Sequence, residues 1–367
     1  DDPDAPQLPG APAEDKDFPA ALLRRRLVDM DKMFAVAHGS PEATNVLGNN
    51  VWAKQSYAFV HMCLYGERNK FQKPFAKFLQ RIAKEPVTEA MFKECFNMTY
   101  KQMLMQIRSY SESTVYETKI YQSKKGGEDL IVAPPPLALR EATQSEVGRI
   151  KGEALVLAGH RDAARLALIA PYVRGERDPE LLAALGVYEK QGGKDADARK
   201  FLEAAWTGKT TRPDALLELA RFRYADALAK PEGPEKLFSL AQVRSIADLL
   251  LVARRQPPHN VAIYDLLADT WARSSVKPKP EDARPIVEGA VFFPMRLKLV
   301  YQSIYFAVDM GDLKSAHALA DHGIRYAPDA NVKKRFEDAK AQLPPAPASA
   351  PAADAPKAEP QKAAAKK

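Results

Sequence analysis

Apolar residues recur at intervals of three and four along most of the chain, which is the period of a helix buried on one face. The pattern begins at 49–66 and continues through 71–83, 88–96 and 100–110, where Thr88 stands at a natural N-cap position. These stretches predict a helical domain of about four helices. Strand-like alternation is confined to 114–122, so we expect at most one short β-hairpin, near 114–133.

Beyond the prolines at 134–136, small and apolar residues recur 34 positions apart. Gly152, Gly186 and Ala220 form one such series. Three further pairs have the same spacing: Ala164 with Ala198, Pro179 with Pro213, and Leu182 with Leu216. A period of this length indicates a repeated supersecondary unit.

Small residues at a fixed position suggest two antiparallel helices per unit, because closely packed helices need small side chains where their axes cross. A unit of this size cannot bury its apolar face alone, so it stacks on its neighbours. The sequence therefore predicts an all-α chain, with an N-terminal helical domain followed by an α-solenoid of about five helix pairs. An insertion at 230–235 shifts the second helix of the third pair to about 237–255.

Composition marks the boundaries of these parts. Residues 1–17 are rich in acids and prolines and predict a disordered leader, and 342–367 form a Pro/Ala/Lys tail. Between them we expect the helical domain at 18–113, a hairpin and Pro-rich linker at 114–144, and the repeats at 145–341.

The repeated residues resemble the tetratricopeptide family. In the second unit Leu182, Leu185 and Gly186 match its first helix, and Ala198 and Leu202 match its second. The last unit matches through Gly311, Ala316, Ala320, Gly323 and Pro328, whereas the spacing from the third to the fourth unit stretches to 48. The resemblance implies a superhelix that binds a protein or an extended peptide on its concave face.

In that register the first helix of each unit lines the concave face. Residues placed in or beside the groove are Arg149, Glu153, Lys190, Arg221, Tyr224, Asp269, Arg273, Tyr301 and Tyr305. Arginine and tyrosine are common at binding hot spots, and arginine can clamp a carboxylate with two hydrogen bonds. The alternative for each residue is an ordinary solvated surface position.

The charge of the chain changes this picture little. The net charge is +7 and the pI about 9.1, but acids are almost as numerous as bases, so we expect no nucleic-acid partner. No apolar run approaches the roughly 18–20 residues that cross a bilayer, so no transmembrane segment is expected. The sequence opens without a methionine or signal peptide, and we interpret it as starting inside a longer protein.

No catalytic motif stands out. The six histidines, His38, His61, His160, His259, His317 and His322, lie outside HExxH and zinc-finger spacings, and phosphate-binding and GxSxG motifs do not occur. We therefore expect no catalytic residue, metal site or cofactor in this chain.

Cys63 and Cys95 are either two small buried side chains or a single disulfide.

Residues 18–112 resemble a helical segment of bacterial gluzincin-type metallopeptidase domains fused to tetratricopeptide repeats, the segment that follows the zinc site. The resemblance rests on FAVAHGSP at 34–41, on Gln55-Ser56-Tyr57 and on the aromatic spacing from Phe92 to Tyr110. It implies an alternative function, the substrate-positioning part of a longer exported zinc peptidase, and favours an exported or periplasmic bacterial protein. The zinc-binding region has no counterpart here, so His61 is interpreted as a packing or subunit-contact residue.

Overall fold

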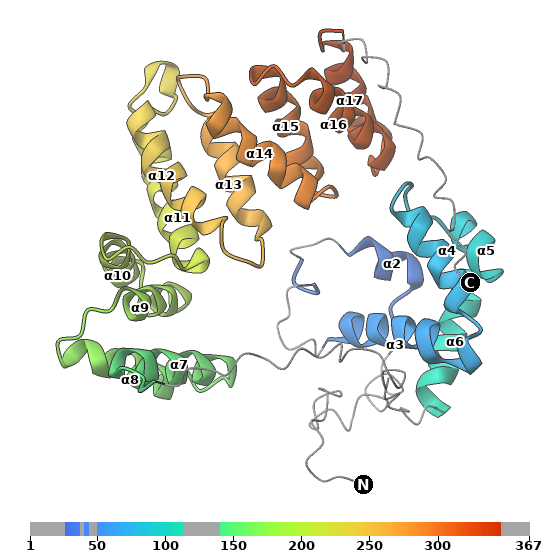
Figure 1. Cartoon of the computed structure of the whole chain (residues 1–367), viewed down its shortest axis with the longest axis horizontal. Helices are drawn as coiled ribbons and strands as arrows, with labels where there is room; N and C mark the ends of the chain where they lie inside the picture. Colours follow the sequence, from blue (N-terminus) through green and yellow to red (C-terminus); the bar gives the residue numbers. More distant parts are fainter. Residues whose placement is uncertain (1–25, 37–39, 44–49, 114–139, 346–367) are drawn as a thin grey trace, which may run out of the picture.

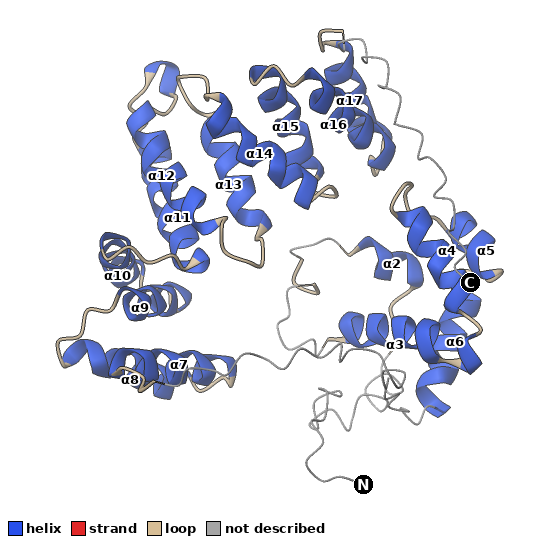
Figure 2. Cartoon of the chain, in the orientation of Figure 1, coloured by secondary structure: helices blue, strands red, loops and turns tan. Residues whose placement is uncertain are grey.

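The computed structural model describes residues 26–36, 40–43, 50–113 and 140–345. These parts contain helices and no strand, with one isolated bridge between Phe238 and Ser274 (Figure 2). The predicted all-α class is therefore confirmed. The hairpin expected near 114–133, the leader at 1–17 and most of the tail lie outside the described residues.

The N-terminal domain folds around one core of aromatic and methionine side chains. Its helices are α2 (Met30–Ala35), α3 (Val51–Tyr65), α4 (Gln72–Ile82), α5 (Glu89–Phe96) and α6 (Tyr100–Ser113), with a short 3-10 turn at Glu67–Asn69. Thr88 caps α5 as predicted, since its side chain accepts a hydrogen bond from the Met91 backbone N–H at 3.2 Å. Phe92 lies at the centre and stacks on Phe96 with ring centroids 4.4 Å apart.

The repeat array consists of five helix pairs and a closing helix between residues 140 and 345. The pairs are α7 (Gln144–Leu157) with α8 (Arg161–Val173), α9 (Pro179–Gln191) with α10 (Asp195–Thr207), α11 (Pro213–Ala229) with α12 (Leu240–Ala253), α13 (Val261–Ala272) with α14 (Pro280–Phe292), and α15 (Leu297–Asp309) with α16 (Leu313–Tyr326). The closing helix is α17 (Ala330–Ala341), and a 3-10 turn at Pro234–Lys236 lies in the predicted insertion.

The small residues of the repeat lie where the two helices of a pair cross. A Cβ atom on Gly152 would approach the Leu168 side chain to 2.4 Å, and one on Gly186 would approach Leu202 to 2.6 Å. Both distances are below van der Waals contact, so only glycine allows these helices to come so close. The 34-residue series therefore marks helix contacts, as the sequence predicted.

The pairs follow one another in an arc from α7 to α17 (Figure 1). Each first helix contacts the first helix of the next pair, as α9 contacts α7 and α11, and each second helix contacts the following first helix. Among the described residues no comparable contact joins successive second helices. The first helices are therefore closer together and lie on the inner side of the curve.

No helix within the described residues is both long and apolar enough to cross a membrane.

Candidate partner-binding groove

The nine residues predicted to line the groove all lie on, or at the end of, the first helices of the pairs. Arg149 and Glu153 belong to α7, Lys190 to α9, Arg221 and Tyr224 to α11, Asp269 and the C-cap Arg273 to α13, and Tyr301 and Tyr305 to α15. Their side chains differ in what they contact, and these contacts separate residues that join the repeats from residues exposed to a partner.

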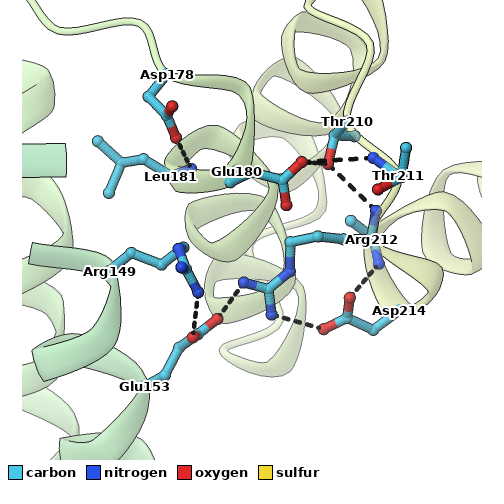
Figure 3. A network of polar contacts seen from close by, with 10 residues as sticks. Arg149, Glu153, Asp178, Glu180, Leu181, Thr210, Thr211, Arg212 and Asp214 are labelled. Carbon is cyan, nitrogen blue, oxygen red and sulfur yellow. Dashed lines mark hydrogen bonds and ion pairs between the residues drawn. The ribbon is translucent and has the colours of Figure 1, made fainter. Parts of the chain in front are cut away.

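Glu153 joins the first pair to the third (Figure 3). Its carboxylate accepts a hydrogen bond from Arg149 Nη1 at 3.2 Å and forms an ion pair with Arg212 Nη1 at 2.5 Å. Arg212 precedes α11 and also reaches Asp214 at 3.4 Å. Burial lowers the pKa of Arg212, but Asp214 and Glu153 outweigh that effect, so its pKa lies above the ordinary value. Arg149 and Glu153 therefore hold the array together.

The loop before α11 is fixed to the start of α9 in the same network (Figure 3). Thr210 Oγ1 donates to Glu180 Oε1 at 2.8 Å and accepts from the Arg212 backbone N–H at 3.3 Å. Asp178 caps α9 by accepting from the Leu181 backbone N–H at 2.9 Å. Sequence reasoning missed Arg212 because it lies between helices, outside the 34-residue series.

Asp269 has a similar joining role between the fourth and fifth pairs. Its carboxylate accepts hydrogen bonds from Lys298 Nζ at 2.7 Å and from Gln302 Nε2 at 2.8 Å, both on α15. One turn earlier on α13, Asp265 pairs with Arg296 at 2.9 Å. The negative charges of α13 are therefore matched within the array.

Lys190 and Tyr224 also contact neighbouring side chains. Lys190 Nζ lies 2.9 Å from Asp195 Oδ1 and 4.6 Å from the centroid of the Phe222 ring. Tyr224 is half-buried, with its ring edge-on to Phe238 at a centroid distance of 5.5 Å. Both side chains are therefore partly engaged within the array.

Arg221, Arg273 and Tyr305 remain exposed on the inner helices. Among the described residues, Arg221 pairs only with Glu218 of its own helix, at 2.5 Å, and the Arg273 guanidinium makes no hydrogen bond or ion pair. The Tyr305 hydroxyl lies 3.0 Å from that of Tyr301, and this hydrogen bond, with burial, raises the pKa of Tyr305 to about 12. Tyr305 therefore stays uncharged at neutral pH.

Tyr305 also borders a cavity of about 350 Å³ at the end of α13. Trp271, Val276, Pro278 and Phe306 supply apolar walls, and Ser275, Lys277, Gln302 and Asp309 supply polar ones. Ala272 and Ser274, the chain neighbours of Arg273, also line the cavity. This part of the inner face thus has a recess with partly apolar walls, next in sequence to a cation that pairs with no described residue.

A larger cavity, of about 1260 Å³, lies where the N-terminal domain meets the end of the fifth pair. The two parts are linked there by a hydrogen bond from Arg325 Nη1 to the Lys84 carbonyl, at 3.2 Å. Its lining includes Phe34, Tyr100, Leu104, Met295, Tyr326 and Pro328. Burial, together with the charges of Glu89 and Asp31, raises the pKa of Tyr100 to about 12. No local motif marks this cavity, because its walls come from distant segments.

Four of the described histidines, His61, His259, His317 and His322, make side-chain contacts. His61 is half-buried, with Nδ1 2.7 Å from the Tyr110 hydroxyl, and burial lowers its pKa. His317 and His322 each contact a backbone carbonyl at 2.8 Å, those of Pro344 and Pro294. Within the described parts of the chain, no three His, Cys, Asp or Glu residues are grouped so that they could hold a metal ion.

The two cysteines are both buried and both free, so of the two alternatives the structure has separate thiols. Burial raises the pKa of Cys63 to about 12. These side chains act as small apolar residues of the N-terminal core.

Comparison with known proteins shows a structural likeness. No protein-family model and no curated protein matches the chain. A crystal structure of a thermophilic TPR protein from Thermus thermophilus is similar over 54% of this chain and 98% of that one, at 17% identity and a TM-score of 0.29. The helical repeat fold described above rests on the geometry of this chain, and the peptidase resemblance of residues 18–112 stays a prediction.

Proposed function

We propose that the inner face of the repeat array binds an extended peptide segment of a partner protein. The surface between Arg221 and Tyr305, on α11, α13 and α15, makes the main contact. The observation that carries the proposal is the exposed guanidinium of Arg273, which pairs with no described residue, together with the cavity lined by its chain neighbours Ala272 and Ser274.

The charges on this face favour a peptide with an acidic side chain or a terminal carboxylate. Asp265 and Asp269 are paired with residues of the fifth repeat, so Arg273 contributes positive charge that nothing in the described residues neutralises. A guanidinium can donate two parallel hydrogen bonds to a carboxylate, which gives direction as well as energy. An apolar side chain of the same peptide fits the cavity.

The proposal is tested with fluorescein-labelled ten-residue peptides that contain Tyr, Leu and Glu, compared with matched peptides in which Gln replaces Glu. We expect the acidic peptides to bind more tightly in fluorescence anisotropy. The R221A/R273A double variant should weaken that binding at least about tenfold, a loss of about 1.4 kcal/mol, with an unchanged Tm because both side chains are exposed.

The matched control removes two exposed cations from second helices, Lys200 on α10 and Arg255 after α12. The K200A/R255A variant should bind the acidic peptides as the unmodified chain does. Equal affinity in the R221A/R273A variant, or an equal loss in the control, would reject this groove.

A further inference from the structure

The free side of α7 carries four apolar residues in one stripe. Val147, Ile150, Ala154 and Leu157 follow one another at spacings of three, four and three, so they share one face of the helix. Ala154 is exposed, and the exposed fractions of Val147, Ile150 and Leu157 are 46%, 58% and 60%. The opposite side of α7, at Gly148 and Gly152, packs against α8. We call these four residues the α7 stripe.

The same positions are buried one repeat later. Counting 34 residues forward from the first three members of the stripe gives Leu181, Ala184 and Tyr188 on α9, with exposed fractions of 0%, 5% and 8%. The Tyr188 hydroxyl donates to the Arg161 carbonyl of the preceding pair at 2.9 Å. In α9 this surface therefore packs against the preceding pair. Among the described residues, α7 has no such pair before it.

The C-terminal end of the array, at α17, has a charged outer surface instead of an apolar one. Phe336 of α17 is buried against Gly323 of α16, where a Cβ atom would approach the ring to 2.1 Å. The outer side of α17 is charged, with Lys333, Lys334, Glu337 and Asp338 all exposed. A second copy that added its α17 end to the α7 stripe would place these charges on apolar residues. If two α7 helices contact each other instead, apolar residues meet apolar residues. Both copies then use the same surface, as a two-fold interface requires.

The charges beside the stripe fit such a pair. The spacing corresponds to positions a and d of a heptad, and Glu146 and Lys151 then occupy the flanking positions g and e. In a parallel pair of helices, g of one copy lies beside e of the next heptad of the other, five residues further on. Lys151 makes no ion pair with any described residue. Both carboxylate oxygens of Glu146 already accept hydrogen bonds from Arg140, and one of them also accepts the Thr143 backbone N–H. A carboxylate has about four acceptor sites, so Lys151 of a second copy would join this cluster at the remaining one.

We propose that the α7 stripe is a self-association surface, on which the α7 helix of a second copy of this chain packs in parallel about a two-fold axis. Val147, Ile150, Ala154 and Leu157 form the apolar contact, and Glu146 of each copy pairs with the partner copy's Lys151. The stripe spans about 16 Å along the helix at 1.5 Å per residue. So short a contact gives a dimer that dissociates on dilution.

Sedimentation velocity over a range of concentrations of the full chain tests this proposal. The unmodified chain should shift from monomer to dimer as its concentration rises, and I150E or L157E should raise the dissociation constant at least tenfold by burying a charge. The control is L166E, because Leu166 on α8 is 69% exposed but lies outside the stripe. A chain that stays monomeric throughout, or an equal effect of L166E, would overturn the proposal.

A charge exchange tests the parallel arrangement. K151E should weaken the dimer because it places two carboxylates together, and E146K should weaken it by placing two cations together. Mixing the two variants should restore association, since each copy then meets an opposite charge, and this rescue also separates lost pairing from any effect of E146K on the helix cap. Failure of the mixture to associate would rule out the parallel pair.

Discussion

The N-terminal domain and the repeat array are both helical, but their helices are held together by different kinds of residue. In the N-terminal domain, the rings of Phe34, Phe59, Phe78 and Phe92 meet in one cluster with centroids 5.5–6.4 Å apart. In the array, glycine and alanine lie at the helix crossings and each pair contacts its neighbours. One region depends on a single core, and the other on the same contact made several times.

This difference predicts different responses to mutation. A single core is lost as a unit when a central side chain is removed, because every helix of the domain packs on it. In a repeat array the stability is close to a sum of local terms from each unit and each interface, so damage in one unit spreads only to its neighbours.

The largest effect is expected for Phe92→Ala. Phe92 is fully buried and contacts Phe34, Phe59, Phe78, Phe96 and Tyr100. Its removal should destabilise the N-terminal domain by about 3–5 kcal/mol. Hydrogen exchange read by mass spectrometry should show faster exchange throughout 50–113 and unchanged exchange in 179–341. Equal acceleration in both regions would mean that they unfold as one unit.

A smaller and more local effect is expected for Gly186→Val. The added side chain would strike Leu202 at the α9–α10 crossing. Overpacking of this kind should destabilise the second pair by about 1–3 kcal/mol, with faster exchange in α9, α10 and the adjacent helices only. The control is Ala225→Val, an exposed position on α11 that should change little. Loss of protection in α15 and α16 as well would contradict the local model.

The smallest effect concerns the pH dependence of the N-terminal domain, which contains both cysteines. The pKa of Cys63 is raised from 9.0 to about 12 in the folded state, so the folded thiol keeps its proton where the unfolded thiol loses it. The stabilising contribution is therefore complete below pH 9 and is lost as the pH rises from 9 to 12. Urea unfolding of C63A should show a weaker loss of stability over that interval, relative to its own value at pH 7.

Alkylation by iodoacetamide at pH 8 complements that measurement. We expect slow labelling of Cys63 in the unmodified chain, because the thiol is buried and protonated. Labelling should be as slow in the Gly186→Val variant and markedly faster in Phe92→Ala. Fast labelling of the unmodified chain would show that the N-terminal core opens readily.

The sequence predicted most helices because their apolar periodicity and caps are local. The helix expected at 88–96 begins after Thr88 as predicted, and the insertion at 230–235 lies before α12, which spans Leu240–Ala253 rather than 237–255. The contacts made by the groove residues could not be predicted in the same way. The 34-residue register placed Glu153 and Asp269 on the inner helices, but it could not show that Arg212 and Lys298 would neutralise them.

The sequence by itself determined the helical class, the pairing of helices and the small residues at their crossings, because these depend on spacings within about 34 residues. Only the tertiary structure decided which charges meet across repeats, which cations stay exposed, and that the α7 stripe remains uncovered by any described residue. The physical reason is that these outcomes depend on how each pair is rotated against the next. That rotation comes from the packing of many side chains, and no local pattern encodes it.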